Sequence, residues 1–96
     1  MTSVPDHSAR FRRSDRVDET RVGDRVVLYH RDTGSGVVLN PTGSLIWDAL
    51  ASPQSAGQLA DRLAARFPAT LPARIATDVG GYVDSLLENQ LIASDS

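Results

Sequence analysis

The chain contains no cysteine among its 96 residues. This absence excludes a disulfide framework, a thiolate metal site and a cysteine nucleophile, and it favours a reducing compartment, for which the cytoplasm is the simplest expectation. Aromatic residues make up only 5% of the sequence, so Leu, Val, Ile and Ala must supply most of the core. No apolar run approaches the length of a membrane span, and the first residues lack the basic and apolar regions of a signal peptide. We therefore expect a soluble, unprocessed protein without a membrane partner.

Lysine is absent as well, and ten Arg residues face ten Asp and two Glu, for a net charge of -2. That balance argues against sequence-independent binding to phosphate backbones. Residues 1–32 carry a net charge of +1 and residues 33–96 a net charge of -3, an asymmetry too small to mark a nucleic-acid surface. With 41% hydrophobic residues, a chain of this length is expected to form one small globular domain.

Residues 25–30 form the clearest predicted strand, because β-branched and aromatic residues there are bounded by turn formers. A turn over residues 32–36 leads into a second strand over residues 36–39, which predicts an antiparallel hairpin. An earlier strand is expected over residues 16–20, where Val17 is the single apolar residue.

The apolar spacing changes from two to 3.6 residues after the second strand. Asn40 and Pro41 suit the cap and the first residue of a helix, Ser55 suits the cap of a second, and Pro72 suits the start of a third. The predicted helices cover about residues 41–52, 56–67 and 72–90. We interpret Trp47, in the first of them, as a core aromatic.

This order of elements predicts an α+β, winged-helix-like fold in which a three-stranded antiparallel sheet is followed by three helices. Residues 1–10 are expected to form a flexible tail, residues 11–92 the domain, and residues 93–96 a frayed C-terminus. Leu91 and Ile92 are expected to close back on the core.

No group of residues indicates catalysis. His7 lies in the expected tail, and His30 with Asp32 is the one local pair of metal-ligand residues, so we interpret His30 as a solvated histidine. The segment 34–36 (GSG) matches no phosphate-binding loop and is interpreted as a hairpin turn, and no nucleophile motif is present. We expect no enzymatic activity, no metal and no cofactor.

Two features suggest a binding surface. If the strand over residues 36–39 lies at a sheet edge, its unpaired main-chain groups can accept an added peptide strand. Gly80 and Gly81 lie within the third predicted helix, where each costs about 1 kcal/mol relative to Ala. They indicate either a close approach of another backbone or a break between two shorter helices, and both interpretations stay open.

Several segments resemble the PqqD family. They are residues 11–15 (FRRSD), 26–28 (VVL) and 36–43 (GVVLNPTG), followed by DV at 78–79, YV at 82–83, Leu86, and LI at 91–92. The LNPTG block is similar in particular to standalone members found in lasso-peptide and related peptide-maturation pathways, and the resemblance covers about residues 11–92. The sequence differs from the family pattern at Gln90, where many relatives have Gly, and at Gly80 and Gly81, where better helix formers are usual.

This resemblance implies a RiPP recognition element, a winged-helix-like domain without catalytic activity. Such a domain binds the leader region of a ribosomally made precursor peptide and presents it to a separate maturation enzyme, such as a leader peptidase or a cyclase. In that family the leader adds as a β-strand beside the third strand and lies in a cleft shared with the third helix. The peptide-binding residues that this implies here are Ser35, Gly36, Val37, Val38, Leu39, Arg74, Ile75, Asp78, Val79 and Tyr82.

Alternation along the strand places Val37 and Leu39 toward the core and Val38 nearer the ligand. In the helix, Ile75 and Val79 fit a purely structural role in the core equally well. Arg74 and Asp78 lie off the apolar stripe and are candidates for polar contacts.

Two other function classes remain. A winged-helix regulator would read DNA through its last helix, but that helix carries Arg74 against Asp78, Asp84 and Glu88, a net charge of -2 that opposes docking on phosphates. An edge-strand adaptor would pair its sheet edge with another protein or with a second copy of itself, which would form a homodimer.

Overall fold

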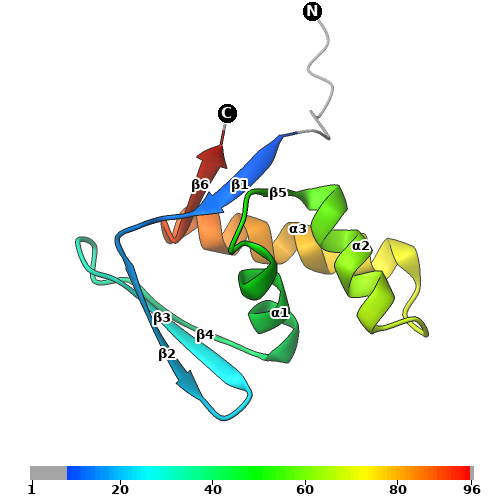
Figure 1. Ribbon diagram of the computed structural model, residues 1–96, viewed down its shortest axis with the longest axis horizontal. Coiled ribbons are helices and arrows are strands. Elements are labelled where there is room, and N and C mark those ends of the chain that lie inside the picture. The colour runs from blue at the N-terminus through cyan, green and yellow to red at the C-terminus, as the bar shows by residue number, and fades with distance from the viewer. Residues whose placement is uncertain (1–8, 96) are drawn as a thin grey trace, which may run out of the picture.

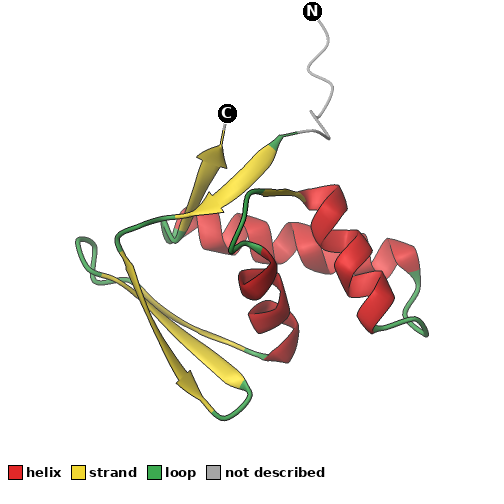
Figure 2. Ribbon diagram, in the orientation of Figure 1, coloured by secondary structure: helices red, strands yellow, loops and turns green. Residues whose placement is uncertain are grey.

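The computed structural model describes residues 9–95 and confirms the predicted α+β, winged-helix-like fold. One antiparallel sheet extends to one side of a group of three helices, and a second small sheet lies above them in the view of Figure 1. In Figure 2, which is coloured by secondary structure, the helices are red and the strands yellow. The elements are β1 (Arg10–Arg13), β2 (Val17–Val22), β3 (Arg25–His30), β4 (Gly36–Leu39), α1 (Pro41–Ala49), β5 (Gln54–Ser55), α2 (Ala56–Arg66), α3 (Pro72–Glu88) and β6 (Ile92–Asp95).

The larger sheet has the strand order β2-β3-β4, and both of its strand pairs are antiparallel. The hairpin of β3 and β4 has the predicted bounds, whereas β2 runs two residues beyond the predicted end at residue 20. Val26 lies opposite Leu39, and Leu28 lies opposite Val37. Because consecutive residues of a strand point to opposite faces, these residues share the face that is turned toward the helices.

The core fills the space between this face and the three helices. Its members are buried aliphatic side chains together with Trp47, as the composition predicts. They are Val26, Leu28, Leu39, Ile46, Trp47, Ala49, Leu50, Leu59, Leu63, Ile75, Val79, Val83, Leu86, Leu91 and Ile92.

The predicted helix starts are confirmed. The Asn40 side chain accepts a hydrogen bond from the Gly43 N–H at 2.8 Å, with Pro41 as the first residue of α1. Ser55 caps α2 through a reciprocal pair with Gln58, in which each side chain accepts the other residue's backbone N–H. Each cap satisfies backbone donors that have no partner inside the helix.

The second sheet, of order β5-β1-β6, was not predicted. Arg10, assigned to the flexible tail, begins β1, and residues 93–95, assigned to a frayed end, lie in β6. Those two boundaries are wrong because β1 pairs with β6 along its whole length, from Arg10 opposite Asp95 to Arg13 opposite Ile92. The remaining tail residues, 1–8, and Ser96 lie outside the described residues.

Trp47 is buried as predicted, and it also connects the two sheets through polar contacts. Its indole N–H donates to a Glu19 carboxylate oxygen at 2.7 Å, and the Arg13 guanidinium lies 4.5 Å from the centre of its ring. Arg13 Nε also donates to the Trp47 carbonyl at 3.1 Å. The same Glu19 oxygen lies 3.8 Å from Arg13 Nη1. The Arg13 cation over the ring and this shared carboxylate hold β1, β2 and α1 together.

The helix α3 ends next to a residue in a left-handed conformation. Gln90 has φ 58°, a left-handed conformation that favours glycine. The Gln90 N–H donates to the Leu87 carbonyl and the Leu91 N–H donates to the Leu86 carbonyl, which is the paired pattern of a helix C-terminus that ends on a left-handed residue.

We predict that Gln90→Gly raises the free energy of unfolding by about 1 kcal/mol, because it removes the steric cost of a left-handed side-chain-bearing residue. Urea unfolding monitored by circular dichroism measures this change. Gln90→Ala, which keeps a Cβ at the same φ, is the control and should give no such gain. Equal stability of the glycine and alanine variants would contradict this account of the helix end.

Candidate functional site

β4 has one main-chain edge without a partner among the described residues, because it is the last strand of its sheet. The His30 N–H donates to the Ser35 carbonyl at 2.8 Å. This bond shows which residues of β3 and β4 are hydrogen-bonded to each other and which lie between those pairs. In an antiparallel pair, every second residue bonds to the neighbouring strand, and the residues between them point their N–H and C=O groups outward. The register therefore directs the backbones of Val37 and Leu39 to β3, and those of Gly36 and Val38 to the free edge.

The two outer strands of this sheet differ in charge. β2 has the sequence VDETRV, whose charged side chains are a common protection against pairing with another chain. β4 has the sequence GVVL and carries no charge. Within this sheet, the uncharged β4 edge is therefore the better position for an added strand.

The side chains of β4 follow the predicted alternation. Leu39 is buried and Val37 packs against the core, whereas Val38 is 60% exposed. Ser35, predicted as part of the site, precedes β4, and its carbonyl is already bonded to His30. Of the five predicted residues in this segment, Gly36 and Val38 are thus the two whose backbones face the open edge.

On α3, the structure separates the predicted residues into two groups. Ile75 and Val79 are 3% and 1% exposed, so they belong to the core and offer no surface to a ligand. Asp78 and Tyr82 are partly exposed on the flank of that buried stripe, and Arg74 is exposed. Burial thus favours the structural interpretation of Ile75 and Val79, which the apolar pattern alone left open.

A pocket of about 330 Å³ lies on this flank of α3, and we call it the α3 pocket. Two predicted residues, Asp78 and Tyr82, line it. Sequence reasoning missed Thr77 and Ser85, because small polar side chains carry no distinctive signal, and it noticed Gly81 as a feature of a binding surface without including it in the predicted site. The lining residues are Thr77, Asp78, Gly81, Tyr82 and Ser85.

Tyr82 connects the α3 pocket to the end of β4. Its hydroxyl donates to Asn40 Oδ1, the same oxygen that accepts the Gly43 N–H. A Cβ built on Gly43 would lie 2.8 Å from a Tyr82 ring carbon and 3.3 Å from Leu39 Cβ, so glycine is required for the ring to pack here. The LNPTG block therefore does two things: it starts α1, and it holds an α3 side chain beside the last residue of β4.

Gly80 and Gly81 fit neither of the two interpretations proposed from the sequence. The helix α3 runs without a break from residue 72 to residue 88, and a Cβ on either glycine would meet nothing within 4 Å. Neither a helix break nor a close backbone contact accounts for them. Gly81 lines the α3 pocket, where the missing side chain leaves open space.

The hairpin that presents β4 is held by polar contacts at its turn. His30 is 5% exposed, and its Nδ1 accepts the backbone N–H groups of Asp32 and Thr33 at 3.2 Å each. It is therefore a buried structural residue rather than the solvated histidine we expected. The Arg16 guanidinium donates two hydrogen bonds of 2.8 Å to the Asp32 carboxylate, which lowers the pKa of Asp32 below its ordinary value.

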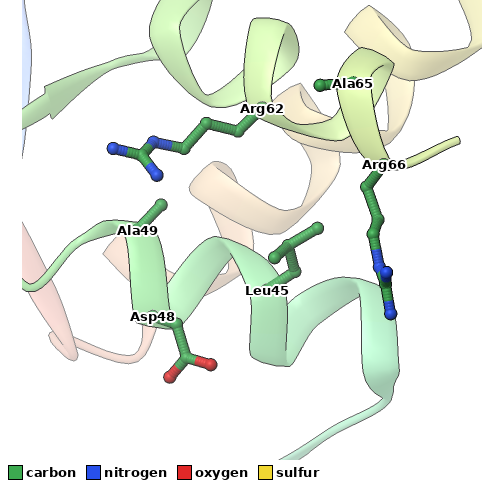
Figure 3. Close-up of a pocket in the computed structure, with 6 residues that line it drawn as sticks. All are labelled: Leu45, Asp48, Ala49, Arg62, Ala65 and Arg66. Atoms are coloured by element: carbon green, nitrogen blue, oxygen red, sulfur yellow. The ribbon is translucent and has the colours of Figure 1, made fainter.

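A larger pocket of about 420 Å³ lies between α1 and α2 and contains none of the predicted residues. Figure 3 shows Arg62 and Arg66 extending from α2 on either side of an aliphatic floor formed by Leu45 and Ala49. At 100° per residue, Leu45 and Gly43 lie about 200° apart on α1, which places this pocket on the side of α1 away from Tyr82. Its helical walls provide no strand edge, so size alone does not make it the better candidate for binding a peptide strand.

Residues 9–95 contain no cluster of three or more His, Asp or Glu side chains suited to a metal ion. In the same part of the chain, no helix is both long enough and apolar enough to cross a bilayer.

Residues 25–92 match the family model of PqqD, coenzyme PQQ synthesis protein D. This match spans well over half of the chain and includes β3, β4 and all three helices. The chain belongs to the PqqD family.

The fold and the sequence are also similar to a solved structure described as "TbiB1 in Complex with the TbiA(beta) Leader Peptide". The TM-score is 0.79 and the sequence identity 25%, over 88% of this chain and 98% of that one. No curated protein gives a significant match.

Proposed function

We propose that this protein is a RiPP recognition element that binds the leader region of a ribosomally made precursor peptide by strand addition at β4. The observation that carries the proposal is the uncharged free edge of β4, where the backbones of Gly36 and Val38 point outward. An added strand would satisfy these donors and acceptors, and main-chain pairing of this kind tolerates variation in the peptide sequence. The similarity to TbiB1, whose solved structure contains a leader peptide, supports the proposal.

Specificity would come from side chains beside the added strand. Val38 presents an exposed apolar side chain, and the α3 pocket with Tyr82 and Asp78 provides a second, more polar surface. Leu39, Ile75 and Val79 contribute indirectly, because they pack in the core and hold β4 and α3 in place. The β4 backbone would thus provide much of the affinity, and the Val38 side chain and the α3 pocket would select the peptide.

We further propose that the protein is not an enzyme and that it acts as an adaptor for a separate maturation enzyme, such as a leader peptidase. The LNPTG block favours a lasso-peptide type of pathway, on the basis of its resemblance to standalone family members. A strand edge and a helix flank are sufficient to hold a peptide, whereas bond cleavage or cyclisation requires reactive groups on another protein.

Fluorescence anisotropy tests the proposal directly. A dye-labelled peptide covering the N-terminal leader of a candidate precursor, chosen from short reading frames near the gene for this protein, is titrated with the folded protein, and saturable binding at micromolar concentrations or below is expected. A scrambled peptide of the same composition is the control. Absence of binding at tens of micromolar, with the fold verified by circular dichroism, would contradict the proposed function.

A further inference from the structure

We propose that the α3 pocket binds a basic side chain, Lys or Arg, of the leader strand. This inference rests on the proposed function and names the chemical class of leader residue that the pocket selects. Its volume of about 330 Å³ lies at the small end of the range for ligand sites, which suits one long side chain better than a whole small molecule.

The polar groups lining the pocket are suited to a cation. Asp78 provides a carboxylate, Thr77 and Ser85 provide hydroxyl oxygens, and no Lys, Arg or His is among the lining residues. A lysine ammonium or an arginine guanidinium donates several hydrogen bonds and accepts none. The lining therefore complements a basic side chain and offers little to an acidic one.

The Tyr82 ring also suits a long basic side chain. Its hydroxyl is held by Asn40, so the ring is fixed as a wall of the pocket. An aromatic ring packs against the methylene groups of a lysine or arginine and attracts the charged end when it lies over the ring face. A carboxylate beside a fixed ring therefore favours a long basic side chain over a long apolar one.

Arg74 is the nearest competitor for the Asp78 carboxylate. The distance between Arg74 Nε and Asp78 Oδ2 is 3.7 Å, which is beyond hydrogen-bond range, and the Arg74 side chain is 74% exposed. Such an exposed pair contributes little, so Asp78 keeps its capacity to accept hydrogen bonds from a ligand. Across α3 the charge is -2, from Arg74 against Asp78, Asp84 and Glu88, which adds a weak general attraction for a basic peptide.

The position of the pocket matches the path of an added strand. Tyr82 contacts Asn40, which directly follows β4, so the pocket lies beside the C-terminal end of the strand edge. Every second residue of an added strand points to the helix side of the sheet. A long side chain at one of those peptide positions would extend from the β4 edge toward α3.

The experiment replaces each basic residue of the leader, one at a time, by an uncharged analogue of similar length: norleucine for Lys and citrulline for Arg. Binding is measured by anisotropy against wild-type protein and the Asp78→Asn variant. We expect one replacement to weaken binding to the wild type by about fivefold, the size expected for an exposed ion pair with a cation–π contribution. In Asp78→Asn, the same replacement should weaken binding by only about twofold, because the ion pair is gone and only the cation–π contact with Tyr82 remains.

Two further variants make the test specific. Arg74→Gln removes the competitor and should strengthen binding of the unmodified leader by about twofold. Asp84→Asn makes the same change of charge as Asp78→Asn on an exposed position of α3 outside the pocket, and should leave the effect of the peptide replacement unchanged.

The outcomes separate this inference from the proposed function. If the leader does not bind at all, strand addition at β4 is wrong. If the leader binds but no uncharged replacement weakens it, or Asp78→Asn behaves like Asp84→Asn, the pocket does not select a basic side chain and the proposed function still stands.

Discussion

Replacing Val38 by proline is expected to weaken leader binding by about 30-fold or more while the domain stays folded. Proline lacks the N–H that the Val38 backbone directs to the open edge, so an incoming peptide carbonyl would lose its partner and remain unsatisfied. A lost main-chain bond together with an unsatisfied partner costs about 2 kcal/mol, which corresponds to this loss of affinity.

The fold should tolerate the change because the Val38 N–H takes no part in the ladder with β3. Proline is accepted at edge positions whose N–H faces solvent, and Val37, the preceding residue, already has the extended conformation that proline requires. We expect the free energy of unfolding to fall by no more than about 1 kcal/mol. Urea unfolding and leader titration of the same preparation measure both effects.

Val38→Ala is the matched control for the proline variant. It removes the exposed isopropyl group and keeps the N–H, so any loss of affinity from it reports the side chain alone. If Val38→Pro binds the leader as tightly as Val38→Ala, strand addition through this residue is excluded.

Replacing Gly43 by alanine is expected to destabilise the domain by about 1–2 kcal/mol, although alanine is the better helix former. The added methyl group would lie 2.8 Å from the Tyr82 ring and must displace it. Displacement breaks the hydrogen bond from the Tyr82 hydroxyl to Asn40, which connects α3 to the end of β4. Leader affinity should fall as well, because Tyr82 forms a wall of the α3 pocket.

A double-mutant cycle with Tyr82→Ala tests the cause of this destabilisation. Once the ring is removed, Gly43→Ala should lower the free energy of unfolding by at least about 1 kcal/mol less than it does in the wild type, because the ring that the new methyl group would clash with is gone. Urea unfolding of the wild type, the two single variants and the double variant gives the coupling free energy between positions 43 and 82. An equal cost in both backgrounds would show that Tyr82 is not the reason for glycine at this position.

Features that depend on neighbouring residues were predictable from the sequence. The hairpin of β3 and β4 follows from short β-branched runs around a turn, and the starts of α1 and α2 follow from the capping residues Asn40 and Ser55. The open edge of β4 was anticipated as well, because the hairpin leads directly into a helix.

Features that depend on distant partners were not predictable. β1 has the sequence RFRR, with a single apolar residue, and it becomes a strand because β5 and β6, both distant in sequence, pair with it. β5 has just two residues, too few for any periodic pattern to be visible. The contact between Tyr82 and Gly43 likewise joins two helices that are far apart in sequence.

The candidate site likewise combines features that neighbouring residues predict with features that depend on distant contacts. The apolar stripe of α3 was visible in the sequence, but Ile75 and Val79 on the stripe and Tyr82 on its flank could be told apart only once the burial of each residue was known. Gly81 was noticed as an unfavourable helix residue, yet its place in the α3 pocket depends on which side of the helix remains uncovered.

Amide hydrogen exchange, measured by NMR with and without the leader peptide, tests strand addition at β4 most directly. The account predicts that exchange of the Val38 N–H slows by at least about tenfold in the complex, and that it slows more than exchange of the Val37 N–H, which the register already directs to β3. A leader that binds while the Val38 N–H exchanges at its free rate would contradict the account.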